Sequence, residues 1–155
     1  MSFLNHEVFK YALTHNKPMA EYDDVMNIAR RYGFEESIDL STSKIEVRDW
    51  VVVKTRHQKG FEKCNALPIE QTKTLVHHDY TKAIILIGKE GDIVSKLIEV
   101  EKEVSTLFPK AFVLIAGAQT LRPSLEASGI DALGTLKKFK KNVESLPSMG
   151  ILLLD

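Results

Sequence analysis

The chain has 155 residues, of which 44% are hydrophobic and 27% charged, and its 21 basic side chains balance its 21 acidic ones. This composition is typical of one folded domain with a sizeable core, and the balanced charge gives no general attraction to nucleic acid or to anionic membranes. The single cysteine excludes an intramolecular disulfide, and no run of about 18 apolar residues would span a membrane. The first residues lack the basic and apolar regions of a secretory signal, so we expect a cytoplasmic protein.

Apolar residues at helical spacing predict two helices at the start of the chain, over 4–15 and over 19–32. We expect a single α/β domain over residues 1–155, in which residues 1–21 form a helical extension.

Short runs rich in apolar and β-branched residues predict the strands of a sheet. The runs at 83–87 and 111–116 are apolar throughout, which is typical of strands buried on both faces. We place these two runs and the run at 50–54 near the centre of the sheet. The predicted strands span 37–40, 50–54, 83–87, 111–116 and 151–154.

Four further helices are predicted. The clearest covers 93–107, where apolar residues recur every three or four positions and Asp92 supplies a cap. Another helix opens at Pro68, a short one covers 122–128, and a lysine-rich one follows residue 136 and runs to about 143.

The order strand, helix, strand over 83–116 is that of a crossover between parallel strands, which is normally right-handed. We therefore predict an α/β fold: a three-layer or two-layer sandwich with a mixed, mostly parallel sheet of about five strands and an N-terminal helical extension.

The loop after the 111–116 strand contains the candidate ligand site. Gly117 allows a turn with positive φ, and Gly129 suits the position that ends a helix. A helix start beyond the end of a strand commonly binds phosphate or carboxylate. Arg122 and Glu126 are four residues apart, so their charges would meet on one face of a helix. The candidate ligand-binding residues are Gly117, Gln119, Thr120, Arg122, Ser124 and Glu126.

The segments KAFVL at 110–114, AGA at 116–118 and RPSLEASGID at 122–131 resemble an uncharacterised prokaryotic family of predicted metal-binding proteins. Members of that family carry KAFxLGAGPC, then a cysteine-rich loop, then RPSMEACGIDVFxTV. The similarity covers roughly residues 22–155 and includes the closing run GILLLD at 150–155.

The family's cysteines are missing from this chain. Thr55, Lys59 and about Leu67 stand where the resemblance places three thiols, and Ala118 and Ser128 replace two later ones. The family's cysteine spacing implies tetrahedral zinc or an iron–sulfur cluster. Because this chain has one thiol, out of that register, we expect a cysteine-depleted member with no metal site and no cofactor.

The polar loop around Cys64 offers an alternative. Lys63 is adjacent and would lower the pKa of the thiol, and His57 could serve as its base. A substitute metal site would need His57, Cys64, His77 and His78, but neighbouring histidines on a helix diverge by about 100°. We interpret the histidines as surface residues and the cysteine as incidental.

A basic run near residue 140 could contact phosphates, but no aromatic residues are interleaved with it. We interpret it as a solvated helix face helped by the C-terminal dipole, and we expect no nucleic-acid partner. The run consists of Lys137, Lys138, Lys140 and Lys141.

The sequence favours a non-enzymatic small-ligand or protein-binding module, with no catalytic residue assigned. The expected partner is a small anionic ligand or a protein, and a homodimer is left open. The alternative is an enzyme or redox accessory that uses Cys64 or an anion-binding cleft at Arg122. A third reading, a faint resemblance of the crossover unit to the second half of a cobalamin-binding domain, lacks the DxHxxG motif.

Overall fold

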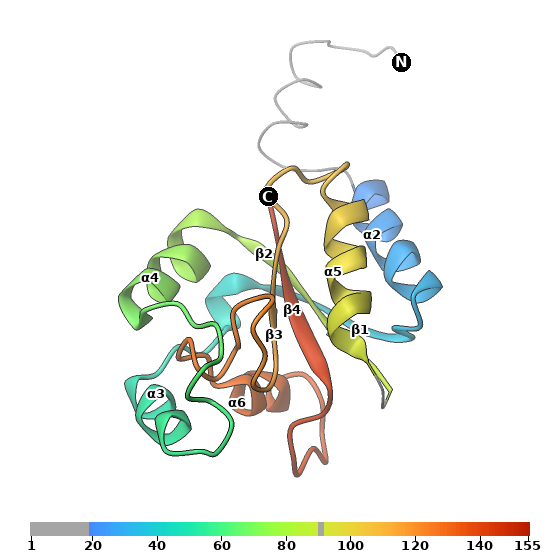
Figure 1. The fold of residues 1–155 in the computed structure, drawn as a ribbon. Helices are drawn as coiled ribbons and strands as arrows, with labels where there is room; N and C mark the ends of the chain where they lie inside the picture. Colours follow the sequence, from blue (N-terminus) through green and yellow to red (C-terminus); the bar gives the residue numbers. More distant parts are fainter. Residues whose placement is uncertain (1–18, 90–91) are drawn as a thin grey trace.

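Four strands form one sheet, and helices lie on both of its faces (Figure 1). The computed structural model describes residues 19–89 and 92–155, so the helix predicted over 4–15 and most of the predicted extension lie outside the described residues. The strands are β1 (Glu36–Ser41), β2 (Lys82–Ile87), β3 (Phe112–Ile115) and β4 (Met149–Leu154). The helices are α2 (Met19–Arg31), α3 (Asp49–Arg56), α4 (Ile69–Thr74), α5 (Ile93–Val104) and α6 (Ala132–Lys137), with a 3-10 turn η1 (Thr42–Lys44) and a π turn η2 (Leu75–Asp79).

The prediction of a mostly parallel, five-stranded sheet is wrong. The strand order is β1-β2-β4-β3, and every neighbouring pair is antiparallel. Ile85 of β2, for example, lies opposite Ile38 of β1 on one side and Ile151 of β4 on the other. Both β2 and β3 run against β4, so they point in the same direction, as the predicted crossover requires. They do not pair because β4 lies between them.

Burial on both faces explains why the strand pattern was misleading. Alternate residues of β2 and β4 enter two separate cores, one on each side of the sheet. Ile84 and Leu152 pack beneath α2 and α5, whereas Ile85 and Ile151 face the opposite layer. A continuous apolar run therefore reports two buried faces, which are commonest in parallel sheets but do not fix strand direction.

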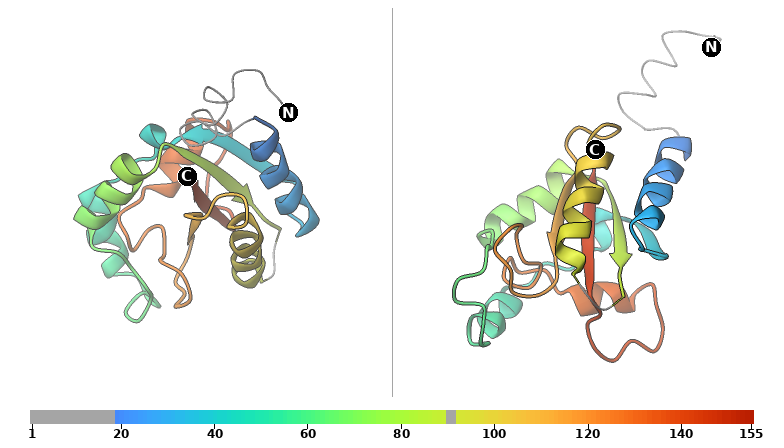
Figure 2. Two further views of the ribbon diagram at one scale, coloured as in Figure 1. Left: turned by 90° about the horizontal axis from the view of Figure 1, so that it is seen from above. Right: turned by 45° about the vertical axis from the view of Figure 1, so that its right-hand side comes forward.

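Two layers of helices cover the sheet. Seen from above, α2 and α5 lie on one side, and α3 and α4 lie on the other (Figure 2). The first layer is held by Val25, Leu97 and Val104, and Tyr32 Oη donates to Glu103 Oε1 at 2.6 Å. Asp92 caps α5 as predicted, since its carboxylate accepts the Ser95 N–H.

The strand predicted at 50–54 is wrong, because α3 occupies this stretch. Val51 and Thr55 are buried four residues apart, which is helical spacing, and Asp49 lies in the first turn, where a carboxylate suits the helix dipole. Trp50 and Val53 are 53% and 51% exposed. Three consecutive valines favour a strand by propensity, but the tertiary environment decides in favour of a helix.

Two of the predicted helices are also wrong, namely those over 122–128 and after residue 136. Residues 122–128 form only a single turn, closed by Gly129 at φ +94°. The Ile130 N–H donates to the Leu125 carbonyl at 2.9 Å, and the Gly129 N–H donates to the Glu126 carbonyl at 3.0 Å. This pair of bonds is the glycine-terminated ending usually seen on full helices.

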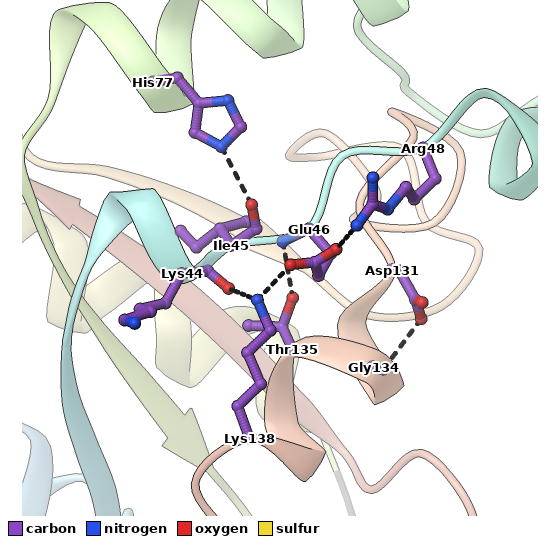
Figure 3. A network of polar contacts seen from close by, with 9 residues as sticks. All are labelled: Lys44, Ile45, Glu46, Arg48, His77, Asp131, Gly134, Thr135 and Lys138. Carbon is purple, nitrogen blue, oxygen red and sulfur yellow. Dashed lines mark hydrogen bonds and ion pairs between the residues drawn. The ribbon is translucent and has the colours of Figure 1, made fainter.

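The lysine-rich helix predicted after residue 136 is displaced toward the N-terminus. It is α6, which begins after Asp131, whose carboxylate accepts the Gly134 N–H at 2.9 Å (Figure 3). Lys138 follows the helix and donates to Glu46, and Lys140 pairs with Glu36. Two of the four lysines are therefore engaged within the fold.

The segment after η1 is hydrogen-bonded to α6 and to the residue before it (Figure 3). Glu46 N–H donates to Thr135 Oγ1 at 2.9 Å, and Asp131 N–H donates to the Glu46 carbonyl at 2.8 Å. The Lys138 ammonium beside Glu46 lowers the pKa of that carboxyl.

No helix in the described part of the chain has the length and apolar character needed to cross a membrane.

Candidate functional site

The loop that leaves β3 turns sharply at Gly117, which has φ +97°. Its N–H donates to both carboxylate oxygens of Glu126 at 3.1 Å. Two of the predicted site residues are thus in direct contact, and the bond holds the Gly117 turn against the turn at 124–130.

Gln119 organises the same loop from within. Its side-chain oxygen accepts the N–H groups of Leu121 at 3.1 Å and Arg122 at 2.9 Å, while its amide nitrogen donates to the Arg122 carbonyl. Ser124 is fully buried and its hydroxyl accepts the Ala127 N–H at 3.3 Å. Thr120 is exposed. These three residues lie in one loop, but Gln119 and Ser124 satisfy the loop's own backbone.

Arg122 pairs with Glu101 of α5. Its Nε and Nη2 atoms lie 2.9 and 2.6 Å from Glu101 Oε1. Glu101 is 8% exposed, and its other oxygen accepts the Val113 N–H of β3 at 2.8 Å. The expected contact between Arg122 and Glu126 is absent, because residues 122–126 are not helical and do not share a face.

A cleft of about 600 Å³ lies beside Arg122. Lys102 and Asn65 are among its polar residues, and Leu121 and Phe112 are among its apolar ones. The Glu101 carboxylate neutralises the guanidinium that an anion would need. The predicted anion site at Arg122 stays a prediction. An anion would have to compete with the Glu101 carboxylate for the Arg122 guanidinium.

Two other clefts adjoin each other at Glu126, with volumes of about 420 and 300 Å³. Gln58, Glu126 and Leu146 belong to the walls of both. The cleft of about 420 Å³ is also lined by Ala116 and Gly117, which follow β3, and by Pro147. The cleft of about 300 Å³ is also lined by Trp50 and other residues of α3 and α6. Volumes of this order are typical of small-molecule sites.

Burial raises the pKa of Glu126 above its ordinary value, and the backbone N–H of Gly117 offsets this in part. Among residues 19–89 and 92–155, no lysine or arginine forms an ion pair with this carboxylate. A half-buried acid without a cationic partner, placed where two clefts meet, is typical of a functional position.

The polar loop at 57–68 lies against the loop that leaves β3. The Asn65 N–H donates to the Gln119 carbonyl and the Ser124 N–H to the Asn65 carbonyl, both at 2.9 Å. The Leu67 N–H donates to Ser128 Oγ at 3.0 Å. The two regions in which the predicted resemblance would place cysteines are therefore neighbours in space.

Cys64 lies in this loop and is partly buried. Burial raises the pKa of its thiol, and the negative charges of Glu126 and Glu62 raise it further. This direction is opposite to the lowering expected from Lys63. The predicted role of Cys64 as a nucleophile stays a prediction, but its environment disfavours the thiolate.

Alkylation of Cys64 tests this environment, since it is the chain's single thiol. We expect iodoacetamide to modify the native protein more slowly than glutathione at pH 7.5, because only the thiolate reacts. Glu126→Gln should speed the reaction by removing a negative charge, whereas the exposed-site change Glu99→Gln should not. Mass spectrometry measures the rates, and an equal rate for all three proteins would contradict the assignment.

The histidines that the structure describes are His57, His77 and His78. His77 Nε2 lies 3.0 Å from the Ile45 carbonyl of the segment after η1 (Figure 3). In the part of the chain that the structure describes, no three His, Cys, Asp or Glu side chains are grouped so that they could hold a metal ion.

The comparisons with known proteins leave the family open. No protein-family model matches the chain, and neither a curated protein nor a solved structure matches it. The resemblance to predicted metal-binding proteins is therefore a hypothesis that depends on the motifs at 110–131 and 150–155.

Three residues of the site were not expected from the sequence. Glu101 lies within the predicted 93–107 helix, but its contact with Arg122 joins residues 21 positions apart and has no local signal. Trp50 was assigned to a strand, although the buried pair at 51 and 55 signals a helix. Gln58 carries no signal in the sequence that would place it beside Glu126.

Proposed function

We propose that this protein is a small-ligand-binding module of the cytoplasm and that its ligand occupies the adjoining clefts at Glu126. One observation carries the proposal: a half-buried carboxylate stands in the common wall of two clefts and lacks a cationic partner among the described residues. A group that only stabilised the fold would normally be paired, because burying an unpaired charge costs stability.

The resemblance to the metal-binding family fits this proposal as a scaffold whose ligand has changed. The two loops that would carry its thiols meet near the clefts, through the contact of Leu67 with Ser128. We propose that the chain keeps this arrangement of loops without the cysteines and that the space beside it serves another small molecule.

Trp50 provides the test, because it is the chain's only tryptophan and lines the second cleft. Three probes of similar size, namely cyclohexylamine, cyclohexanol and cyclohexanecarboxylate, are titrated while Trp50 fluorescence and the heat of binding are recorded. We expect saturable binding of at least one probe. Leu146→Phe, which fills the wall shared by the clefts, should abolish it.

Val143→Phe is the matched control, since it makes the same kind of change on the same connection outside both clefts. Binding that survives Leu146→Phe, or no binding of any probe, would contradict the proposal. Inorganic phosphate is titrated in parallel. A phosphate-induced thermal shift that Arg122→Ala removes would favour the alternative anion cleft instead.

A further inference from the structure

The donors among the described residues leave part of the acceptor capacity of Glu126 unfilled. A carboxylate accepts about four hydrogen bonds, but the donors to Glu126 are backbone N–H groups, those of Gly117 and of Glu126 itself. No side-chain donor reaches it within the described residues. The part of the carboxylate that faces the clefts is open to a donor supplied by a ligand.

The charge of the second cleft is negative. Its ionisable lining residues are Glu126, Asp131 and Lys54, two acids and one base, which leaves one net negative charge. Asp131 is engaged at the start of α6 by the Gly134 N–H. Lys54 is exposed on α3, so solvent screens its charge. Complementarity therefore calls for a ligand with one positive charge.

The same cleft contains an exposed aromatic side chain. Trp50 lies in its wall with 53% of its surface accessible, and no cation of the described chain stacks on its ring. Tryptophan is the best aromatic partner for cations. A carboxylate and an indole in one cleft are the two groups that proteins combine to recognise ammonium ions.

We infer that the clefts at Glu126 bind an organic ammonium ion, whose N–H groups donate to the Glu126 carboxylate, whose positive charge contacts the Trp50 ring and whose hydrocarbon part contacts Leu146. This inference rests on the proposed function. A divalent metal ion fits less well, because calcium and magnesium need six or more oxygen ligands. No cluster of three or more His, Cys, Asp or Glu side chains in the described part of the chain could hold such an ion.

The ionisation of the site adds a dependence on pH. The groups that surround Glu126 are Lys54 of α3, Cys64 of the 57–68 loop and Asp131 before α6. Burial holds the pKa of Glu126 high, and a bound cation favours its charged form. Ammonium binding should therefore weaken as pH falls through the pKa of Glu126 and should release protons near it.

The same three cyclohexyl probes test the ligand class. We expect cyclohexylammonium to bind about tenfold to a hundredfold more tightly than cyclohexanol, as for hydrogen bonds to a charged group, and cyclohexanecarboxylate not to bind. Glu126→Gln should remove this preference, since glutamine keeps an acceptor for the Gly117 N–H but has no charge. Glu99→Gln should retain the preference.

The outcomes separate this inference from the proposed function. Equal binding of the amine and the alcohol would overturn the ammonium assignment and leave a ligand-binding cleft. An amine affinity unchanged in Glu126→Gln, or independent of pH in the parent protein, would also overturn it. If no probe binds, both fall. Urea unfolding of each variant verifies that the native fold is present.

Discussion

Replacing Gly129 with valine is expected to destabilise the protein by about 2–4 kcal/mol. Two physical effects combine at this position. Gly129 has φ +94°, where a β-branched residue is strained, and an added Cβ would lie 2.9 Å from Ile69 Cδ1 and 3.2 Å from Val52 Cγ2. Urea unfolding followed by circular dichroism measures the loss as a lower midpoint with an unchanged slope.

Gly33 supplies the matched control, because it has a nearly identical φ of +96° but no atom within 4 Å of an added Cβ. Gly33→Val therefore costs only the backbone strain, about 1–2 kcal/mol. The excess at Gly129 measures the packing of Ile69 on the turn. Equal losses at both glycines would show that this packing is absent in solution.

Removal of the Glu101 carboxylate should have the second large effect. Glu101→Ala is expected to cost about 2–4 kcal/mol, because it leaves the Arg122 guanidinium without its partner and removes the acceptor for the Val113 N–H. Glu99→Ala, an exposed change on the same helix, should stay within about 0.5 kcal/mol. Urea unfolding again gives both values.

A double-mutant cycle isolates the ion pair from the contact with β3. Arg122→Ala and Glu101→Ala are combined in one protein. The interaction energy is the difference between the stability lost in the double mutant and the sum of the losses in the two single mutants. We expect about 1–2 kcal/mol of coupling, with the rest of the Glu101 effect belonging to Val113. A coupling near zero would show that Arg122 does not use this carboxylate and is free for an anion.

The positions of most elements could be predicted, but the sheet topology could not. Four of the five predicted strands exist, and α2 and α5 lie where apolar periodicity placed them. Whether β2 and β3 pair with each other in parallel depends on whether another strand lies between them. β4 occupies that place, and a connection of more than 30 residues separates it from β3. Local apolar patterns contain no information about such an insertion.

The candidate site was predicted in part for the same reason. Gly117, Glu126 and Gly129 could be identified because turn chemistry and motif spacing are local properties. The partner of Arg122 was wrongly expected at i+4, since that expectation depended on a helix that does not form. Trp50 and Gln58 reach Glu126 only through tertiary packing, which no spacing in the sequence reveals.

The central position of β4 has a consequence for biosynthesis. The ribosome makes β4 after every other described strand, yet β3 pairs with no strand except β4. β1 and β2 can pair early, whereas Val113 and its neighbours on β3 wait for residues 149–154 to emerge. Until then the edges of β2 and β3 that pair with β4 carry unpaired backbone N–H and C=O groups and are open to aggregation or to a chaperone. The sheet is therefore completed late, by insertion of β4, one of its two central strands.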